Sequence, residues 1–104
     1  MNYKQQREKL KLHTSNKETP KELLQTIGID ITKDGFIRVR PEDRTPSCKI
    51  NKDGSFYDFG SSEYYSDIVA LLYDGYAAFD SLTDTMQWVC QQVNIPWEVN
   101  NGQA

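Results

Sequence analysis

The sequence predicts an α+β fold in which a small antiparallel sheet of about four strands follows one helix and precedes two more. Two kinds of signal carry this prediction. Asp-Gly turns stand twice between short runs of strand-forming residues, and three other segments have helix-start and helix-stop residues around apolar positions at helical spacing. A length of 104 residues suits a single domain with an adequate core.

The helix before the sheet is predicted over residues 20–27. Thr19 is placed to cap it, Pro20 suits its first position, and Gly28 supplies a stop. Residues 1–17 are polar and basic with few apolar residues, so we expect a basic N-terminal arm or helix there. The apolar stripe of the predicted helix consists of Leu23, Leu24 and Ile27.

Four short strands are expected in a meander between residues 29 and 59. Asp34-Gly35 and Asp53-Gly54 provide the positive φ angles that tight hairpin turns require. The strands are expected over residues 29–32, 36–40, 47–51 and 55–59.

Two helices are expected after the sheet. Ser66 can cap the first, over residues 67–74. Asp80 or Ser81 can cap the second, which ends before Pro96. Its apolar positions are Leu82, Met86, Val89, Cys90 and Val93. Near the end of the chain, we expect Trp88 and Trp97 at the edge of the core and residues 98–104 to form a flexible tail.

Three motifs occur in a fixed order: Arg44-Thr45-Pro46-Ser47, Phe56-Tyr57-Asp58-Phe59-Gly60 and Ser66-Asp67-Ile68-Val69. In this order, residues 18–97 resemble the zinc-binding domain at the N-terminus of bacterial and phage DNA primases. The resemblance implies a zinc-ribbon-like meander and contact with a single-stranded template. It also implies that catalysis belongs to a separate domain.

The zinc ligands of that family are missing from this chain. Its first Cys and its His fall on Arg38 and Pro41, and its second Cys pair falls around Asp58 and Ser61. We therefore expect a metal-free version of the domain, with no other cofactor. The apolar residues expected to replace the metal are Phe36, Ile37, Val39, Ile50, Phe56 and Phe59.

The potential metal donors elsewhere in the chain have the wrong number and spacing. Tetrahedral zinc needs four thiolate or imidazole donors, and the candidates here are Cys48, Cys90 and His13. We expect both cysteines to be small core residues and His13 to be solvated.

Charge is divided unevenly along the chain. All 12 Lys and Arg lie at or before Lys52, together with seven acidic residues, whereas eight acidic residues and no basic one follow it. Such asymmetry suits a molecule with one face for an anion and another for a protein partner. An ordinary solvated surface is the alternative.

Strand alternation places basic side chains on one face of the predicted sheet, with tyrosines on it and in a nearby loop. Cations that follow phosphates, beside rings on which bases stack, are what sequence-tolerant binding of single strands requires. For Arg38 and Arg40 a purely structural, solvated pair is the alternative. The predicted nucleic-acid-binding residues are Arg38, Arg40, Arg44, Lys49, Lys52, Tyr57, Tyr64 and Tyr65.

Catalysis is not expected, and no catalytic residue is assigned. The chain has no clustered carboxylates for magnesium, no phosphate-binding Gly-rich loop, no nucleophile elbow and a single histidine. It has no secretory signal and no apolar run near the ~20 residues that span a bilayer, so a soluble cytoplasmic protein is expected.

The predicted function is that of a non-catalytic accessory protein of DNA replication or priming, encoded by a phage or mobile element. It would bind single-stranded DNA and dock onto a polymerase, primase or helicase. In a sharper variant, the hydroxyl of Tyr64 or Tyr65 serves as a protein primer. The alternative is a protein-interaction module, such as a phage-encoded inhibitor of a host replication or defence enzyme. Neither function needs a membrane or a small-molecule substrate.

Overall fold

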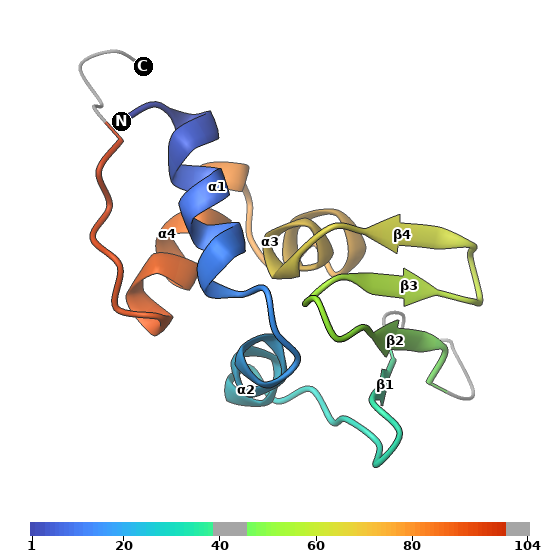
Figure 1. Ribbon diagram of the computed structural model, residues 1–104. Helices are drawn as coiled ribbons and strands as arrows, with labels where there is room; N and C mark the ends of the chain where they lie inside the picture. Colours follow the sequence, from blue (N-terminus) through green and yellow to red (C-terminus); the bar gives the residue numbers. More distant parts are fainter. Residues whose placement is uncertain (39–45, 100–104) are drawn as a thin grey trace.

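The computed structural model describes residues 1–38 and 46–99, which form an α+β fold with a four-strand antiparallel sheet (Figure 1). Two helices precede the sheet and two follow it, the first of these continuing into a π-helical turn, η1. The elements are α1 (Tyr3–His13), α2 (Glu18–Thr26), β1 (Phe36–Ile37), β2 (Cys48–Ile50), β3 (Phe56–Asp58), β4 (Glu63–Tyr65), α3 (Ile68–Ala70), η1 (Leu71–Gly75) and α4 (Leu82–Gln92).

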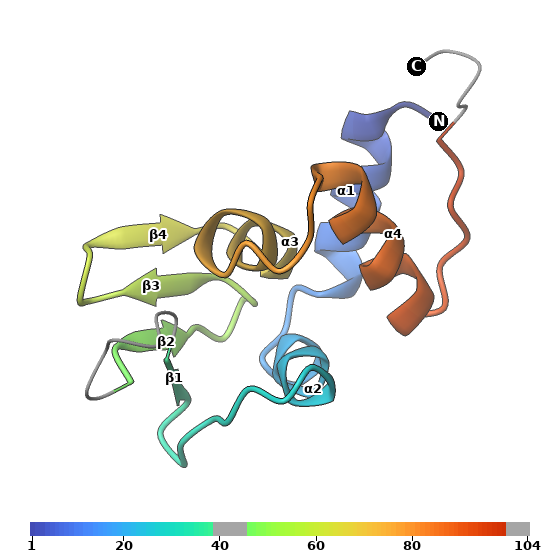
Figure 2. The ribbon, with the colours of Figure 1, turned by 180° about the vertical axis from the view of Figure 1, so that it is seen from behind.

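Helix α1 lies within residues 1–17, where an arm or a helix was expected, so two helices precede the sheet instead of the one in the predicted fold. Asn2 and Gln5 form a reciprocal capping box at its start, with the Asn2 side chain accepting from the Gln5 backbone N–H at 2.8 Å. Helix α1 is polar on most sides and buries only Gln6 and Leu10. Figures 1 and 2 show it lying beside α4, which explains why its few apolar residues suffice.

Helix α2 begins at Glu18, two residues before the predicted start. The capping contact comes from Asn16, whose side-chain oxygen accepts from the Thr19 backbone N–H at 2.7 Å. Gly28, at φ +85°, ends the helix as predicted. Of the predicted stripe, Leu23 and Leu24 are buried and Ile27 is exposed.

The sheet is a meander in the order β1-β2-β3-β4, all pairs antiparallel. Three of its strands, β1, β2 and β3, fall within the predicted ranges 36–40, 47–51 and 55–59, and the fourth does not. The segment expected as the first strand makes only an isolated bridge from Ile31 to Ile37, whereas β4 forms where a loop was expected. A left-handed Ser62, at φ 58°, closes the turn that allows β4 to pair with β3.

The hairpin turn between β2 and β3 is packed against the connection between α1 and α2. Gly54 lies there at φ +84°, and a Cβ added to it would overlap the carbonyl oxygen of Thr14 and lie 3.1 Å from that of Asn16. This turn therefore needs glycine both for its backbone conformation and for space.

Helix α3 is capped by Asp67 rather than by Ser66. The Asp67 carboxylate accepts from the Ala70 backbone N–H at 2.8 Å and forms a two-pronged ion pair with Arg7, at 3.0 and 2.9 Å. This pair ties α1 to the start of α3. Helix α4 is capped by Ser81, whose hydroxyl oxygen accepts from the Asp84 backbone N–H at 3.0 Å.

The core lies between one face of the sheet and the helices. As predicted, Cys48 and Cys90 are buried in it, and burial raises the pKa of the Cys90 thiol. Trp88 and Trp97 pack at its edge, and His13 is exposed. The fully buried apolar side chains include Leu10, Leu24, Ile37, Ile50, Phe56, Ile68, Leu71, Leu72 and Val89.

The chain after α4 returns along α1. The Gln6 side-chain oxygen accepts from the Glu98 backbone N–H at 2.8 Å, and the Glu98 carboxylate lies 3.4 Å from the Lys9 ammonium. Val99 is buried, so residues 98 and 99 of the expected tail are held against the helices. Residues 100–104 lie outside the described part of the chain.

Candidate nucleic-acid interface

The sheet has a buried inner face and an outer face directed away from the core. Because side chains alternate along a strand, neighbouring residues of β2 and β3 fall on opposite faces. The inner face carries Ile37, Cys48, Ile50, Phe56, Asp58 and Tyr65, all buried. The outer face carries Phe36, Lys49, Tyr57 and Tyr64, with Phe59 just beyond the end of β3.

The four outer residues form a row across all four strands. Phe36 is paired in register with Lys49, Lys49 with Tyr57, and Tyr57 with Tyr64. We call these four residues the cross-strand row. The Lys49 ammonium lies 5.8 Å from the centroid of the Phe36 ring, a cation–π distance. The row thus brings three rings and one cation together on a surface that includes Tyr64 at 60 % exposure.

Phe59 adds a fourth ring to this surface. Its ring centroid lies 4.8 Å from that of Tyr57, edge to face, and 6.4 Å from that of Phe36. Phe59 is 61 % exposed, so the expectation that it replaces the metal from within the core was wrong. The signal was available in the sequence, because alternation from the buried Phe56 sends residues 57 and 59 to the opposite face.

Asp58, on the inner face, fixes the turn that carries Phe59. Its carboxylate oxygen accepts from the Ser47 hydroxyl at 3.0 Å and from the Gly60 backbone N–H at 2.9 Å. The side chain is fully buried. These bonds join the start of β2 to the turn after β3.

Asp58 also stands around one of the positions at which the expected primase resemblance would place a zinc ligand. Its oxygen is engaged by the two donors, and Arg38, a cation, stands at another such position. Within residues 1–38 and 46–99, no three His, Cys, Asp or Glu side chains gather in a way that could hold a metal ion. The residues at these positions do not fit zinc.

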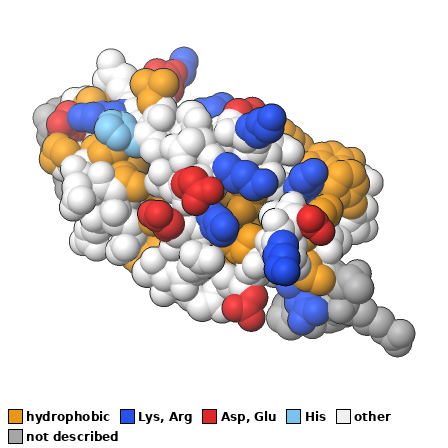
Figure 3. Space-filling view, turned by 60° about the horizontal axis from the view of Figure 1, so that its bottom comes forward, with side chains coloured by type: hydrophobic (Ala, Val, Ile, Leu, Met, Phe, Trp, Pro, Cys, Tyr) orange, Lys and Arg blue, Asp and Glu red, His pale blue; other side chains and the backbone are white. Residues whose placement is uncertain are grey.

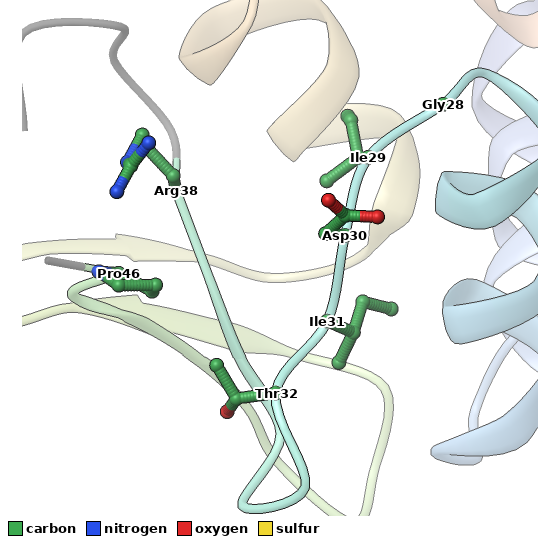
Figure 4. Close-up of a pocket in the computed structure, with 7 residues that line it drawn as sticks. All are labelled: Gly28, Ile29, Asp30, Ile31, Thr32, Arg38 and Pro46. Carbon is green, nitrogen blue, oxygen red and sulfur yellow. The ribbon is translucent and has the colours of Figure 1, made fainter.

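Arg38 follows β1 and is exposed. The Tyr76 hydroxyl donates to its backbone carbonyl. Arg38 and Pro46 line a pocket of about 460 Å³ with the segment Gly28–Thr32. Figure 4 shows Arg38 and Pro46 on one side of this pocket and Ile29, Asp30 and Ile31 on the other.

Tyr65 was predicted as a nucleic-acid-binding residue, but it lies on the inner face at 5 % exposure. Its hydroxyl donates to the Glu63 carboxylate at 3.3 Å, and burial, reinforced by that carboxylate, raises the pKa of Tyr65 to about 12. A buried ring cannot stack on a base, so this assignment is corrected. Of the two tyrosines considered as protein primers, Tyr64 is the accessible one.

The remaining predicted residues are spread over the surface. Lys52 is exposed in the turn after β2, beyond the cross-strand row. Arg40 and Arg44 lie outside the residues that the structure describes. Figure 3 shows Lys and Arg side chains gathered on one face of the molecule, next to exposed hydrophobic side chains and a few carboxylates.

In the described part of the chain, no helix combines the length and apolar character needed to cross a membrane. A search with this chain matches no protein-family model, no curated protein and no solved structure.

Proposed function

We propose that this protein is a non-catalytic accessory protein of DNA replication or priming that binds single-stranded DNA on the outer face of its sheet. The single observation that carries this proposal is the cross-strand row with Phe59. It sets the exposed rings of Tyr64 and Phe59 and the half-buried rings of Phe36 and Tyr57 around Lys49 on the outer face of the sheet. Each base stacked on an aromatic side chain contributes about 1–3 kcal/mol, and the nearby cation attracts phosphate.

The order of the motifs supports the same proposal through the primase resemblance. Asp67 caps the helix after the meander, at the place where the family has its Gly-Asp-x-Ile motif. In a metal-free relative, the Asp58 hydrogen bonds and the buried Ile37, Ile50 and Phe56 take over the stabilisation that zinc supplies in the family.

The protein partner belongs to the same proposal. A binding module without an active site acts usefully in replication when it brings the template to an enzyme on another chain. We therefore propose that the acidic second half of the chain docks onto a polymerase, primase or helicase in the cytoplasm, and that a phage or mobile element encodes the protein.

Fluorescence anisotropy of labelled oligonucleotides, titrated at low and high salt, tests the DNA-binding proposal. Tyr64→Ala and Phe59→Ala each remove one stacking ring, so each is expected to weaken binding by about 5- to 100-fold. Tyr73→Ala is the matched control, because Tyr73 is an exposed tyrosine on η1, outside the sheet. The control is expected to bind like the unaltered protein.

Two outcomes would contradict this proposal. One is the absence of binding by the unaltered protein at low salt. The other is an equal loss of affinity in the Tyr73→Ala control. The alternative function, an inhibitor of a replication or defence enzyme, would then account for the exposed Phe59 as an anchor for a protein surface.

A further inference from the structure

We propose a second nucleic-acid contact surface at the corner where two sheet turns meet the helices. It consists of Lys11, Lys17, Lys33 and Lys52, which we call the lysine corner. Its ligand is the sugar-phosphate backbone of the same single strand that lies on the outer face of the sheet, so this inference rests on the proposed function.

The first turn at this corner is held against the α1–α2 connection. Gly54 packs on the backbone of Thr14 and Asn16 so closely that a Cβ would not fit. Lys52 stands two residues before Gly54 and is exposed. Lys11 stands three residues before Thr14, in the last turn of α1. The packing therefore brings these two lysines, from distant parts of the chain, to one corner.

The second turn, which contains Lys33 and Gly35, lies at the same corner because the Lys17 side chain packs on it. A Cβ built on Gly35 would lie 3.2 Å from the Lys17 ammonium nitrogen, so this ammonium group lies directly over the turn that contains Lys33. The Gly35 carbonyl in turn accepts from the Ile50 backbone N–H at 3.0 Å, which joins this turn to β2, the strand that leads into the first turn. Four lysines thus stand on segments that these contacts pack together.

No described carboxylate holds these four ammonium groups. The ion pairs among residues 1–38 and 46–99 are Arg7 with Asp67 and Lys9 with Glu98. Asp53 lies near Lys11, but it accepts hydrogen bonds from the Ser55 hydroxyl and backbone N–H, which lower its pKa.

Acidic side chains share this corner, since Glu18 and Asp34 adjoin Lys17 and Lys33 in the sequence and are exposed. Binding through the corner must therefore come from direct lysine–phosphate contacts rather than from a long-range positive field. Such contacts release counterions and make the affinity fall with salt.

The lysine corner is linked to the proposed DNA-binding face by β2 and the turn that follows it. Lys49 belongs to the cross-strand row, and Lys52 stands in that turn, three residues later in the sequence. A short oligonucleotide can cover the row alone, whereas a longer one reaches the corner. The inference therefore predicts that substitutions in the lysine corner weaken the binding of long oligonucleotides and not of short ones. The cross-strand row alone does not produce this dependence on length.

The test compares oligonucleotides of about 4 and about 16 nucleotides, spanning the usual site sizes of single-strand binders. The variant carries Lys→Gln at Lys11, Lys17, Lys33 and Lys52, with the four single variants alongside and folding checked by circular dichroism. Binding of the long oligonucleotide is expected to weaken about tenfold or more, with the slope of log affinity against log salt reduced by about 0.7 per lysine in contact. Binding of the short one is expected to stay unchanged.

Lys9→Gln is the matched control, because Lys9 is on the same helix as Lys11 but paired with Glu98, and it is expected to leave both lengths unaffected. Unchanged binding of the long oligonucleotide by the single and combined variants would overturn the inference. An equal loss for both lengths would overturn it too. In either case Tyr64→Ala still reports separately on the outer face, whereas an unaltered protein that binds neither length would remove both proposals.

Discussion

The two faces of the sheet are built from alternate residues of the same strands and both carry aromatic rings, yet their surroundings are opposite. Tyr65 is 5 % exposed and its neighbour Tyr64 is 60 % exposed, while Phe56 is fully buried and Phe59 is 61 % exposed. Residue type alone therefore does not separate core from surface here. The difference comes from the pleat of the strands and from which face the helices cover.

The largest expected effect is on the free energy of unfolding, and it distinguishes Phe56 on the inner face from Phe59 on the outer face. Phe56→Ala removes a fully buried ring and is expected to lower the free energy of unfolding by about 3–5 kcal/mol. Phe59→Ala is expected to change it by less than about 1 kcal/mol while weakening oligonucleotide binding. Urea denaturation followed by circular dichroism measures both. Equal destabilisation by the two substitutions would remove the distinction between the faces.

The next effect concerns Asp58, which lies on the inner face but positions a ring of the outer one. Asp58→Ala leaves the Ser47 hydroxyl and the Gly60 N–H without their acceptor, which is expected to cost about 2–3 kcal/mol of stability. It is also expected to weaken oligonucleotide binding, since the turn bearing Phe59 loses its support. Asp34→Ala, at an exposed turn, is the control. Stability equal to that of the control would contradict this role.

A smaller effect tests how the sheet is docked onto the helices. Gly54→Ala and Gly28→Ala both place Ala at a positive φ, but only Gly54 lacks space for the methyl group, since nothing lies within 4 Å of a Cβ at Gly28. We expect about 1 kcal/mol of destabilisation at Gly28 and about 2 kcal/mol at Gly54. Thermal unfolding of the two variants compares them directly. A Gly28→Ala variant as unstable as Gly54→Ala would show that backbone strain alone explains both losses.

The smallest effect at neutral pH concerns Tyr65, for which Tyr65→Phe is expected to cost about 1 kcal/mol through the lost hydrogen bond to Glu63. Burial raises the pKa of Tyr65 from 10.0 to about 12, so the folded state keeps a proton that the unfolded state loses. The protonated Tyr65 therefore contributes fully to the free energy of unfolding below pH 10, and this contribution is lost as the pH rises to about 12.

The Tyr65→Phe variant has no hydroxyl at this position that could ionise. Its free energy of unfolding is therefore expected to fall less steeply over this alkaline range than that of the unaltered protein. Urea midpoints measured across the range, together with the tyrosinate absorbance, give the comparison. Parallel stability curves for the two proteins would show that Tyr65 ionises equally in both states.

Local signals predicted the elements that depend on neighbouring residues. The turns at Gly35 and Gly54 and the stop at Gly28 were predicted correctly, because a positive φ requires a particular residue at one position. Of the two candidate caps of α4, Asp80 and Ser81, the structure uses Ser81. The buried stripe of α4 was also largely correct, with Met86, Val89 and Cys90 in the core. These features depend on spacing along one segment.

Contacts between distant segments were the ones that the sequence did not reveal. Helix α1 is polar, and it is held by Gln6 against the chain end and by Arg7 against Asp67. Strand β4 forms because β3 offers it an edge, and this pairing turns Tyr65 inward. The candidate site was predicted in part, with Lys49, Tyr57 and Tyr64 on the outer face.

By itself the sequence determined the α+β class, the turns of the meander and the alternation that separates the two faces. Those properties follow from backbone conformations and side-chain periods that are set within a few residues. Only the tertiary structure decided that a fourth strand covers residues 63–65, that Tyr65 is buried, and that segments bearing four lysines pack at one corner. Burial and proximity depend on which distant segments pack together, and the residues of one segment alone do not determine its contacts with another.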